Sequence, residues 1–217
     1  MSDLDSASGD DEWLDVSDAE RSDYPEPPEE EIFDPENYAF RDHDYTEPRP
    51  TDASPEEDFL WAAQAGEMQI AEELLQKNPE LIRTQDSDGY TPLHRACYSN
   101  KVEMVDFLLS KGAPIDLPTT DGWLPLHSAC KWGNHRCAIK LLMHGAPINA
   151  ASGSGQTALH IAASCRSDKK CLKLLLSWPG LDPDLKNAEG ETAYDKALIN
   201  TKQHYLFNAV KKCTKEI

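Results

Sequence analysis

Three histidines in this 217-residue chain stand at equal intervals, a regularity that could serve a metal site. Cys97 and Cys130 follow His94 and His127 by three positions, and the third histidine is His160. Residues three apart share one face of a helix, and histidine and cysteine are the usual ligands of zinc. A cysteine beside a histidine can also be a catalytic nucleophile. The residue types therefore raise two chemical possibilities, a zinc site and a reactive thiol.

Other catalytic patterns are absent from the sequence. No glycine-rich phosphate-binding loop follows an apolar strand, and no Gly-x-Ser-x-Gly nucleophile elbow occurs. The Asp and Glu pairs after residue 57 fall on turns or on positions predicted to face solvent. We therefore expect a non-catalytic protein that needs no cofactor.

The histidines belong to an internal repeat that recurs every 33 positions. The strings DGYTPLHRAC at 88–97, DGWLPLHSAC at 121–130 and SGQTALHIAA at 154–163 keep one register, and leucine pairs at 108–109, 141–142 and 174–175 continue it. Weaker copies flank these three, and the last interval, from Gly155 to Gly190, is 35. We place the two additional residues in the loop at 177–183. Each copy is predicted to form a turn, a short helix and a second helix that ends at glycine.

The TPLHRA string at 91–96 reproduces the signature of the ankyrin repeat, and the period is the same. The chain therefore resembles the ankyrin-repeat family over about 150 residues. That resemblance implies an all-α solenoid of about five helix-turn-helix units, including two caps, at 58–87, 88–120, 121–153, 154–188 and 189–210. Leu124 and Ala158 depart from the signature, which puts local capping bonds in doubt but not the fold.

In the ankyrin pattern the repeated histidine hydrogen-bonds between neighbouring turns. Side chains one repeat apart are separated by about 10 Å, too far to share a zinc ion held about 2 Å from each ligand. Cys97 and Cys130 occupy a position for small residues beside alanine, which favours buried, inert thiols. We expect neither a metal site nor a catalytic thiol.

Charge divides the chain sharply near residue 57. Residues 1–57 contain 21 Asp and Glu against 3 Lys and Arg, while residues 58–217 contain 18 of each, so the formal charge of −18 belongs to the first segment. Seven of the fifteen prolines also lie there. We predict a disordered acidic tail over 1–57, and a short C-terminal tail at 211–217. The acidity argues against direct nucleic-acid binding, and no apolar run is long enough for a membrane span. We expect a soluble, intracellular monomer.

The remaining function is recognition of a protein partner on the concave face formed by turn tips and first helices. The tips are predicted to present Tyr90, Trp123 and Gln156, and the first helices Arg95, Tyr98, Ser99, Ser128, Lys131, Trp132, Ile161 and Ser164. Tyr, Trp and Arg are enriched in binding hot spots. The candidate protein-binding patch is therefore Tyr90, Arg95, Tyr98, Trp123, Lys131 and Trp132. The alternative is that Tyr90 and Trp123 pack against neighbouring turns and that Trp132 covers the next repeat.

Apolar clusters interrupt the acidic tail at 13–16, 32–33 and 38–40. Such a segment could be an activation or docking sequence, or only a solubilising one. A third hypothesis is that it folds over the region of Arg95 and Lys131 and shields it, because the charges are complementary.

Several strings, among them DGWLPLHSACKW at 121–132, FLWAA at 59–63 and HYLF at 204–207, resemble one group within the ankyrin-repeat family. This resemblance implies a nuclear or nucleocytoplasmic protein that regulates transcription positively. A cytosolic adaptor or client-specific chaperone is the alternative, so the expected location is the nucleus, the cytoplasm or both.

Overall fold

The computed structural model describes residues 48–165, 169–201 and 203–207. Within them, nine α-helices and two short 3-10 helices form, and no strand beyond the two isolated bridges Ala151–Thr157 and Lys186–Thr192. None of these helices is both long enough and apolar enough to cross a bilayer. The tail predicted over 1–57 lies outside the described residues up to residue 47, and so does the one at 211–217.

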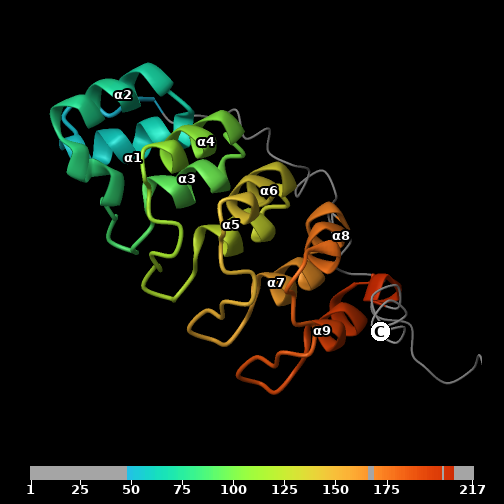
Figure 1. Ribbon diagram of the computed structural model, residues 1–217. Coiled ribbons are helices and arrows are strands. Elements are labelled where there is room, and N and C mark those ends of the chain that lie inside the picture. Colours follow the sequence, from blue (N-terminus) through green and yellow to red (C-terminus); the bar gives the residue numbers. More distant parts are fainter. Residues whose placement is uncertain (1–47, 166–168, 202, 208–217) are drawn as a thin grey trace, which may run out of the picture. The chain divides into compact units, whose positions relative to one another are not determined.

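The helices alternate between two positions along the chain (Figure 1). The first helices of the repeats are α1 (Pro55–Ala65), α3 (Pro92–Tyr98), α5 (Pro125–Lys131), α7 (Ala158–Ser164) and α9 (Ala193–Asn200). The second helices are α2 (Met68–Lys77), α4 (Val102–Ser110), α6 (His135–Met143) and α8 (Lys169–Ser177). The 3-10 helix η1 (Pro79–Arg83) follows α2, and η2 (His204–Leu206) follows α9 in place of a second helix.

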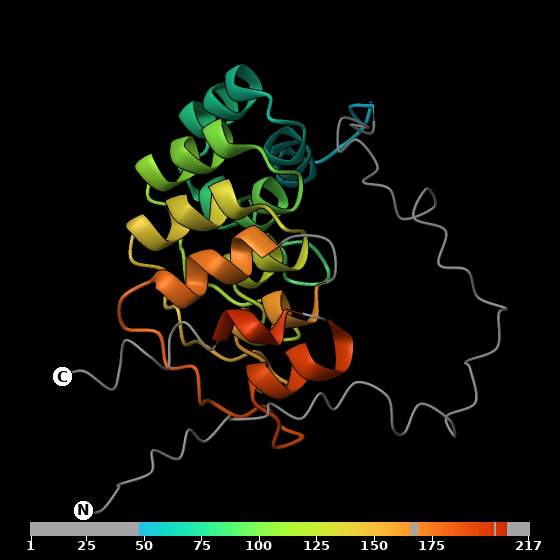
Figure 2. The same ribbon diagram turned by 90° about the vertical axis from the view of Figure 1, so that its right-hand side faces the viewer.

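Each helix pair packs against the next pair in chain order (Figure 2). The first helices contact one another in the series α1, α3, α5, α7, α9, and among the second helices α4 contacts α6 and α6 contacts α8. Because each repeat buries its apolar side chains against its neighbours, the core runs continuously through the stack. The predicted all-α repeat solenoid is confirmed.

The folded part begins earlier than predicted. Helix α1 starts at Pro55, where Ser54 and Glu57 form a reciprocal capping box. Upstream, Arg49 makes a two-pronged ion pair with Asp58, with nitrogen–oxygen distances of 2.6 and 2.9 Å. The predicted boundary at residue 58 is therefore too late. Composition missed it because the acidic residues of the first turn, which favour a helix N-terminus, were assigned to the tail.

Small side chains allow the first helices to approach closely. Pairs of alanine, or of alanine and cysteine, are fully buried in α1, α3, α5 and α7. Cys97 and Cys130 belong to this series and are free thiols. Burial and a hydrogen bond to the Cys137 thiol raise the pKa of Cys97. A hydrogen bond to Cys171, together with burial, raises the pKa of Cys130. The prediction that these thiols are structural is thus consistent with their environment.

The insertion in the fourth repeat is divided between two places. Cys137 and Leu141 are buried in α6, and their equivalents in α8, Cys171 and Leu175, come one position later than the repeat period requires. The left-handed glycine after the helix, Gly145 in one repeat, is Gly180 in the next, two positions later than the period requires. One additional residue therefore precedes the core positions of α8 and one follows them. Placing both at 177–183 was wrong, because three consecutive leucines at 174–176 fit either register.

Candidate protein-binding surface

The Thr-Pro-Leu-His string builds the start of each first helix. The Thr91 hydroxyl accepts the His94 backbone N–H at 3.3 Å, and Pro92 occupies the first helical position, where no N–H is required. In return the Thr91 N–H donates to His94 Nδ1 at 3.2 Å. These reciprocal bonds fix the angle at which the chain enters α3, and so fix where its exposed side chains lie.

The three repeated histidines connect neighbouring turns. His94 Nε2 donates to the Trp123 carbonyl at 3.0 Å, His127 Nε2 to that of Ala150 at 3.1 Å and His160 Nε2 to that of Glu191 at 3.1 Å. Since Nδ1 accepts a backbone N–H, both ring nitrogens are occupied and the imidazole is neutral. Burial lowers the pKa of all three, that of His94 to about 4.

This arrangement supports the structural interpretation of the histidines over a zinc site. Within the described residues, no group of three His, Cys, Asp or Glu side chains could hold a metal ion. A ligand needs a free nitrogen lone pair, and each histidine already uses its own to accept a backbone N–H.

The two departures from the signature have different consequences. Leu124 has no side-chain acceptor, so its helix lacks the capping bond, although the Leu124 N–H still donates to His127 Nδ1 at 2.9 Å. Ala158 replaces only the proline, and Thr157 keeps the full capping box. The doubt raised by the sequence therefore applies to Leu124 alone.

The turn tips are held by backbone contacts with the next tip. The Thr120 N–H donates to the Asp88 carbonyl at 3.0 Å, and the Gly153 N–H donates to that of Asp121 at 2.8 Å. Gly122 has φ +76°, and a Cβ there would lie 2.6 Å from the Gly153 nitrogen. Glycine is thus required twice, by conformation and by close approach. The tips form a rigid edge.

Three of the six predicted patch residues lie at this edge, and we call Tyr90, Arg95 and Trp123 the tip cluster. Arg95 is ion-paired with Asp86, donates to Gln64 Oε1 at 3.2 Å and has its Cζ 5.5 Å from the Tyr90 ring centroid. Tyr90 packs edge-on against His94, and Trp123 lies half-buried against the core. The cluster is therefore packed and not an open patch, but the ring contacts of Tyr90 are with residues of its own repeat and not with a neighbouring turn.

The other three, Tyr98, Lys131 and Trp132, form what we call the helix-end cluster, at the C-terminal ends of α3 and α5. The Tyr98 and Trp132 rings meet edge-to-face, with centroids 4.7 Å apart, and so join two consecutive repeats. Trp132 remains 39% exposed, and Lys131 beside it is exposed. Here a large aromatic surface and a cation are accessible together.

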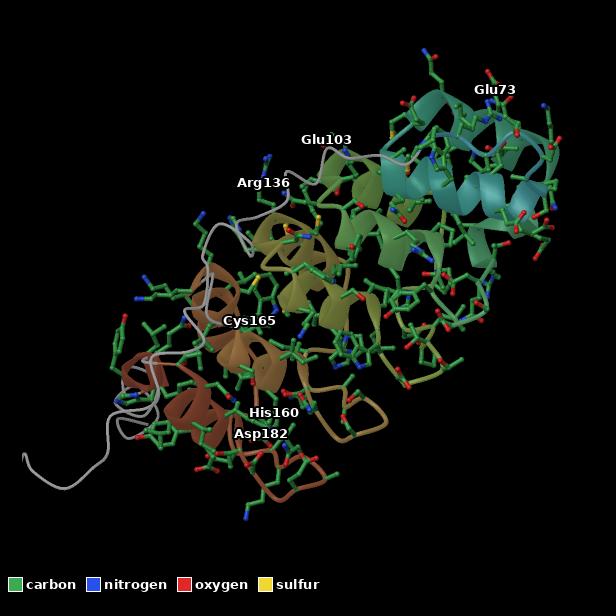
Figure 3. The ribbon with its side chains drawn as sticks, turned by 180° about the vertical axis from the view of Figure 1, so that it is seen from behind. Glu73, Glu103, Arg136, His160, Cys165 and Asp182 are labelled. Carbon is green, nitrogen blue, oxygen red and sulfur yellow. The ribbon has the colours of Figure 1, made fainter. Side chains whose placement is uncertain are left out.

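Asn134, which no sequence pattern singled out, supports the helix-end cluster. Its buried amide donates to the carbonyls of Cys97 at 2.7 Å and Tyr98 at 2.9 Å, which closes the end of α3 onto the start of α6. The signal available in the sequence is that Asn134 stands where the previous repeat has Lys101. In the next repeat the Cys165 thiol makes a similar link to the Lys131 carbonyl at 3.4 Å (Cys165 is labelled in Figure 3).

Three residues predicted to be exposed on first helices are buried. Ser99, Ser128 and Ile161 are enclosed by the adjoining repeats, and the Ser128 hydroxyl has no hydrogen-bond partner among the described residues. Neighbouring first helices approach so closely at these positions that only the longer side chains reach the surface. Gln156 and Ser164 remain half-exposed.

Comparison with known proteins agrees with this geometry. A family-level sequence model for ankyrin repeats (many copies) matches residues 59–109, 93–142 and 138–176. The chain belongs to the ankyrin-repeat family. Ankyrin repeats are protein-interaction modules, generally without catalytic activity, and this chain therefore contains a protein-interaction module.

Among curated ankyrin proteins, the human ankyrin repeat domain-containing protein 49 is 51% identical over 156 residues. That match covers 72% of this chain and 65% of the human protein. The bovine protein of the same name is 51% identical over 72% of this chain and 66% of its own length. The Drosophila melanogaster one is 41% identical over 51 residues, 24% of either chain. The resemblance noticed in the sequence is thus confirmed at the level of similarity.

Proposed function

We propose that this chain is an adaptor whose partner protein docks on the helix-end cluster. The observation that carries the proposal is the edge-to-face pair of Tyr98 and Trp132, which spans two repeats while Trp132 stays 39% exposed. Aromatic rings fixed in this way contribute a large contact area and lose little side-chain entropy on binding. Lys131 supplies an adjacent charge that can orient a partner.

In this proposal the tip cluster is part of the scaffold and not of the binding surface. Arg95 and Tyr90 are held by Asp86, Gln64 and His94, so a partner would have to break existing contacts to use them. Binding energy is therefore expected from the helix-end cluster, with the tips fixing its orientation.

The test is the double substitution Tyr98→Ala/Trp132→Ala in the full chain, followed by crosslinking mass spectrometry in cells. We expect the crosslinked partner to be lost, with an affinity at least about tenfold weaker once it is purified. Ile199→Ala is the matched control, since Ile199 is an exposed apolar residue of α9 outside the cluster. Unchanged crosslinks in the double variant would reject the site, and so would loss of the cooperative unfolding transition.

We further propose that the partner belongs to a nuclear assembly that activates transcription. This is supported by the acidic sequence of residues 1–47, in which apolar residues are interspersed as in activation segments. Crosslinking in separated nuclear and cytosolic fractions tests it. Partners confined to a cytosolic assembly, or to client proteins, would instead identify a cytosolic adaptor or chaperone.

A further inference from the structure

The second helices segregate charge along the stack. The exposed Glu72 and Glu73 lie on α2, and the exposed Glu103 and the half-exposed Asp106 lie on α4. Helices α6 and α8 carry no acidic side chain and present Arg136, Lys140, Lys169, Lys170 and Lys173. Figure 3 shows Glu73, Glu103 and Arg136 projecting from successive second helices on one side of the stack.

The formal neutrality of residues 58–217 conceals this segregation. Residues 58–121 contain eleven Asp and Glu against five Lys and Arg, whereas residues 122–181 contain one against seven. Equivalent positions change sign from one repeat to the next, as from Glu103 in α4 to Arg136 in α6. The segment 122–181, which has this single carboxylate, includes the two adjacent second helices α6 and α8.

Part of the positive charge has no ion-pair partner among the described residues. Lys140 pairs with Asp106 at 2.7 Å, at the junction of the two halves, and Lys169 donates to the Tyr205 hydroxyl at 3.2 Å. Arg136 and Lys173 are exposed, and neither forms an ion pair with any residue that the structure describes. These two cations are available to an external anion.

Apolar side chains lie between the cations. Met143 is 68% exposed and stands one helical turn beyond Ile139, which is half-buried between Arg136 and Lys140 in the sequence of α6. On α8, the half-buried Leu174 follows Lys170 by one turn. The resulting surface, which we call the α6–α8 face, consists of Arg136, Ile139, Lys140, Met143, Lys170, Lys173 and Leu174.

We propose that the α6–α8 face docks an acidic polypeptide segment of a partner protein, with apolar side chains interspersed among its carboxylates. Carboxylates would pair with Arg136 and Lys173, and apolar side chains would cover Met143 and Ile139. Single-stranded nucleic acid is a poorer fit, because its binding sites stack bases on aromatic rings and this face has none. The face shares no residue with the helix-end cluster, so the chain has two separate docking surfaces, as an adaptor requires.

The test uses the full chain and a fluorescein-labelled peptide of about twelve residues in which Glu and Asp are interspersed with Leu and Phe. We expect Arg136→Glu/Lys173→Glu to weaken peptide binding at least about tenfold in fluorescence anisotropy. The matched control is Glu73→Lys/Glu103→Lys, which changes the net charge by the same amount in the opposite direction, on the acidic helices. It should change the affinity less than about threefold. Replacing the apolar peptide residues by serine should also weaken binding.

Four results would overturn the proposal. The first is that the wild type does not bind the peptide. The second is that the two double variants shift the affinity by equal factors in opposite directions, because this would show an effect of net charge and not of a specific face. A single-stranded oligonucleotide of equal charge binding as tightly would indicate a general polyanion site. Carboxyl-to-amine crosslinks of the isolated monomer from Lys173 to residues 1–47 would make the chain's own acidic segment the occupant. Far-UV circular dichroism verifies that each variant folds.

Discussion

The tip cluster and the helix-end cluster each consist of two aromatic side chains and one cation, yet their contacts differ. Arg95 is enclosed by an ion pair, an amide and a ring, whereas Lys131 is exposed. Trp123 packs on the core, whereas Trp132 packs on Tyr98 and remains accessible. Residue type alone therefore does not separate scaffold from binding surface. Whether such a residue is part of the scaffold or of the binding surface depends on its position in the repeat, at a turn tip or at the end of a first helix.

The largest effect is expected at the tips. Gly122→Ala should destabilise the fold by more than about 3 kcal/mol, since it adds left-handed strain to a backbone clash. Gly112 has φ +84° but no atom within 4 Å of a Cβ, so Gly112→Ala should cost only about 1 kcal/mol. Urea unfolding of both variants measures the difference. Equal losses would mean that the tips are not rigid.

Acid should loosen the tips through His94. Its pKa is about 4 in the folded chain, because of burial, and 6.5 is its ordinary value. Between pH 6.5 and 4 the unfolded chain binds a proton that the folded one does not, so stability falls as the pH falls through this window. Below about pH 4 the contribution of His94 to stability changes no further, and the total loss of stability is about 3 kcal/mol.

Urea unfolding at a series of pH values checks this against His94→Gln, which cannot titrate. The variant should be less stable at neutral pH, and its stability curve should converge on that of the wild type as the pH approaches the pKa of His94. Parallel curves for the two proteins would show that His94 is not the group responsible.

Asn134→Ala tests the support of the helix-end cluster. It removes the hydrogen bonds to the carbonyls of Cys97 and Tyr98, so we expect a loss of about 2 kcal/mol and a weaker near-ultraviolet signal from the Tyr98–Trp132 pair. Asn149 also makes two hydrogen bonds, to Gly180 and Asp182, but in exposed loops. Asn149→Ala should cost no more than about 1 kcal/mol. An unchanged aromatic signal in Asn134→Ala would remove this residue from the positioning role.

Substitution of the two cations, Arg95 and Lys131, should give the smallest effects. The first should affect mainly stability and the second mainly binding. Arg95→Ala should cost about 1 kcal/mol of stability and affect a partner little. Lys131→Ala should stay within about 0.5 kcal/mol of the wild type but reduce the association rate with the partner. Thermal unfolding and stopped-flow binding separate these outcomes. The reverse pattern would exchange the roles assigned to the two clusters.

The fold was predictable because each repeat specifies its own structure. The histidine and the small buried residues recur every 33 positions, and two of these three repeats also have the capping threonine, so the same local structure is specified several times. The predicted register was wrong only where the repeat pattern is ambiguous, at the three consecutive leucines at 174–176. The predicted start of the folded part was too late because charge composition does not distinguish the acidic first turn of a helix from an acidic tail.

The site was predictable in residue type but not in role. The partner of Arg95 is Asp86, a turn-tip residue that no local pattern links to it. The burial of Ser128 depends on how closely α5 approaches its neighbours, and the function of Asn134 depends on carbonyls of the preceding repeat. Such contacts arise only from stacking.

The buried cysteines offer a way to follow that stacking directly. Cys97, Cys130, Cys137 and Cys171 have almost no exposed surface, so an alkylating reagent can modify them only after the helices around them separate. Cys97 with Cys137 samples the junction of the second and third repeats, and Cys130 with Cys171 samples the next junction. The labelling rate of each thiol in the native protein therefore measures the opening free energy of one junction. By mass spectrometry alone, without any engineered label, one could determine whether the stack opens from an end or in its middle.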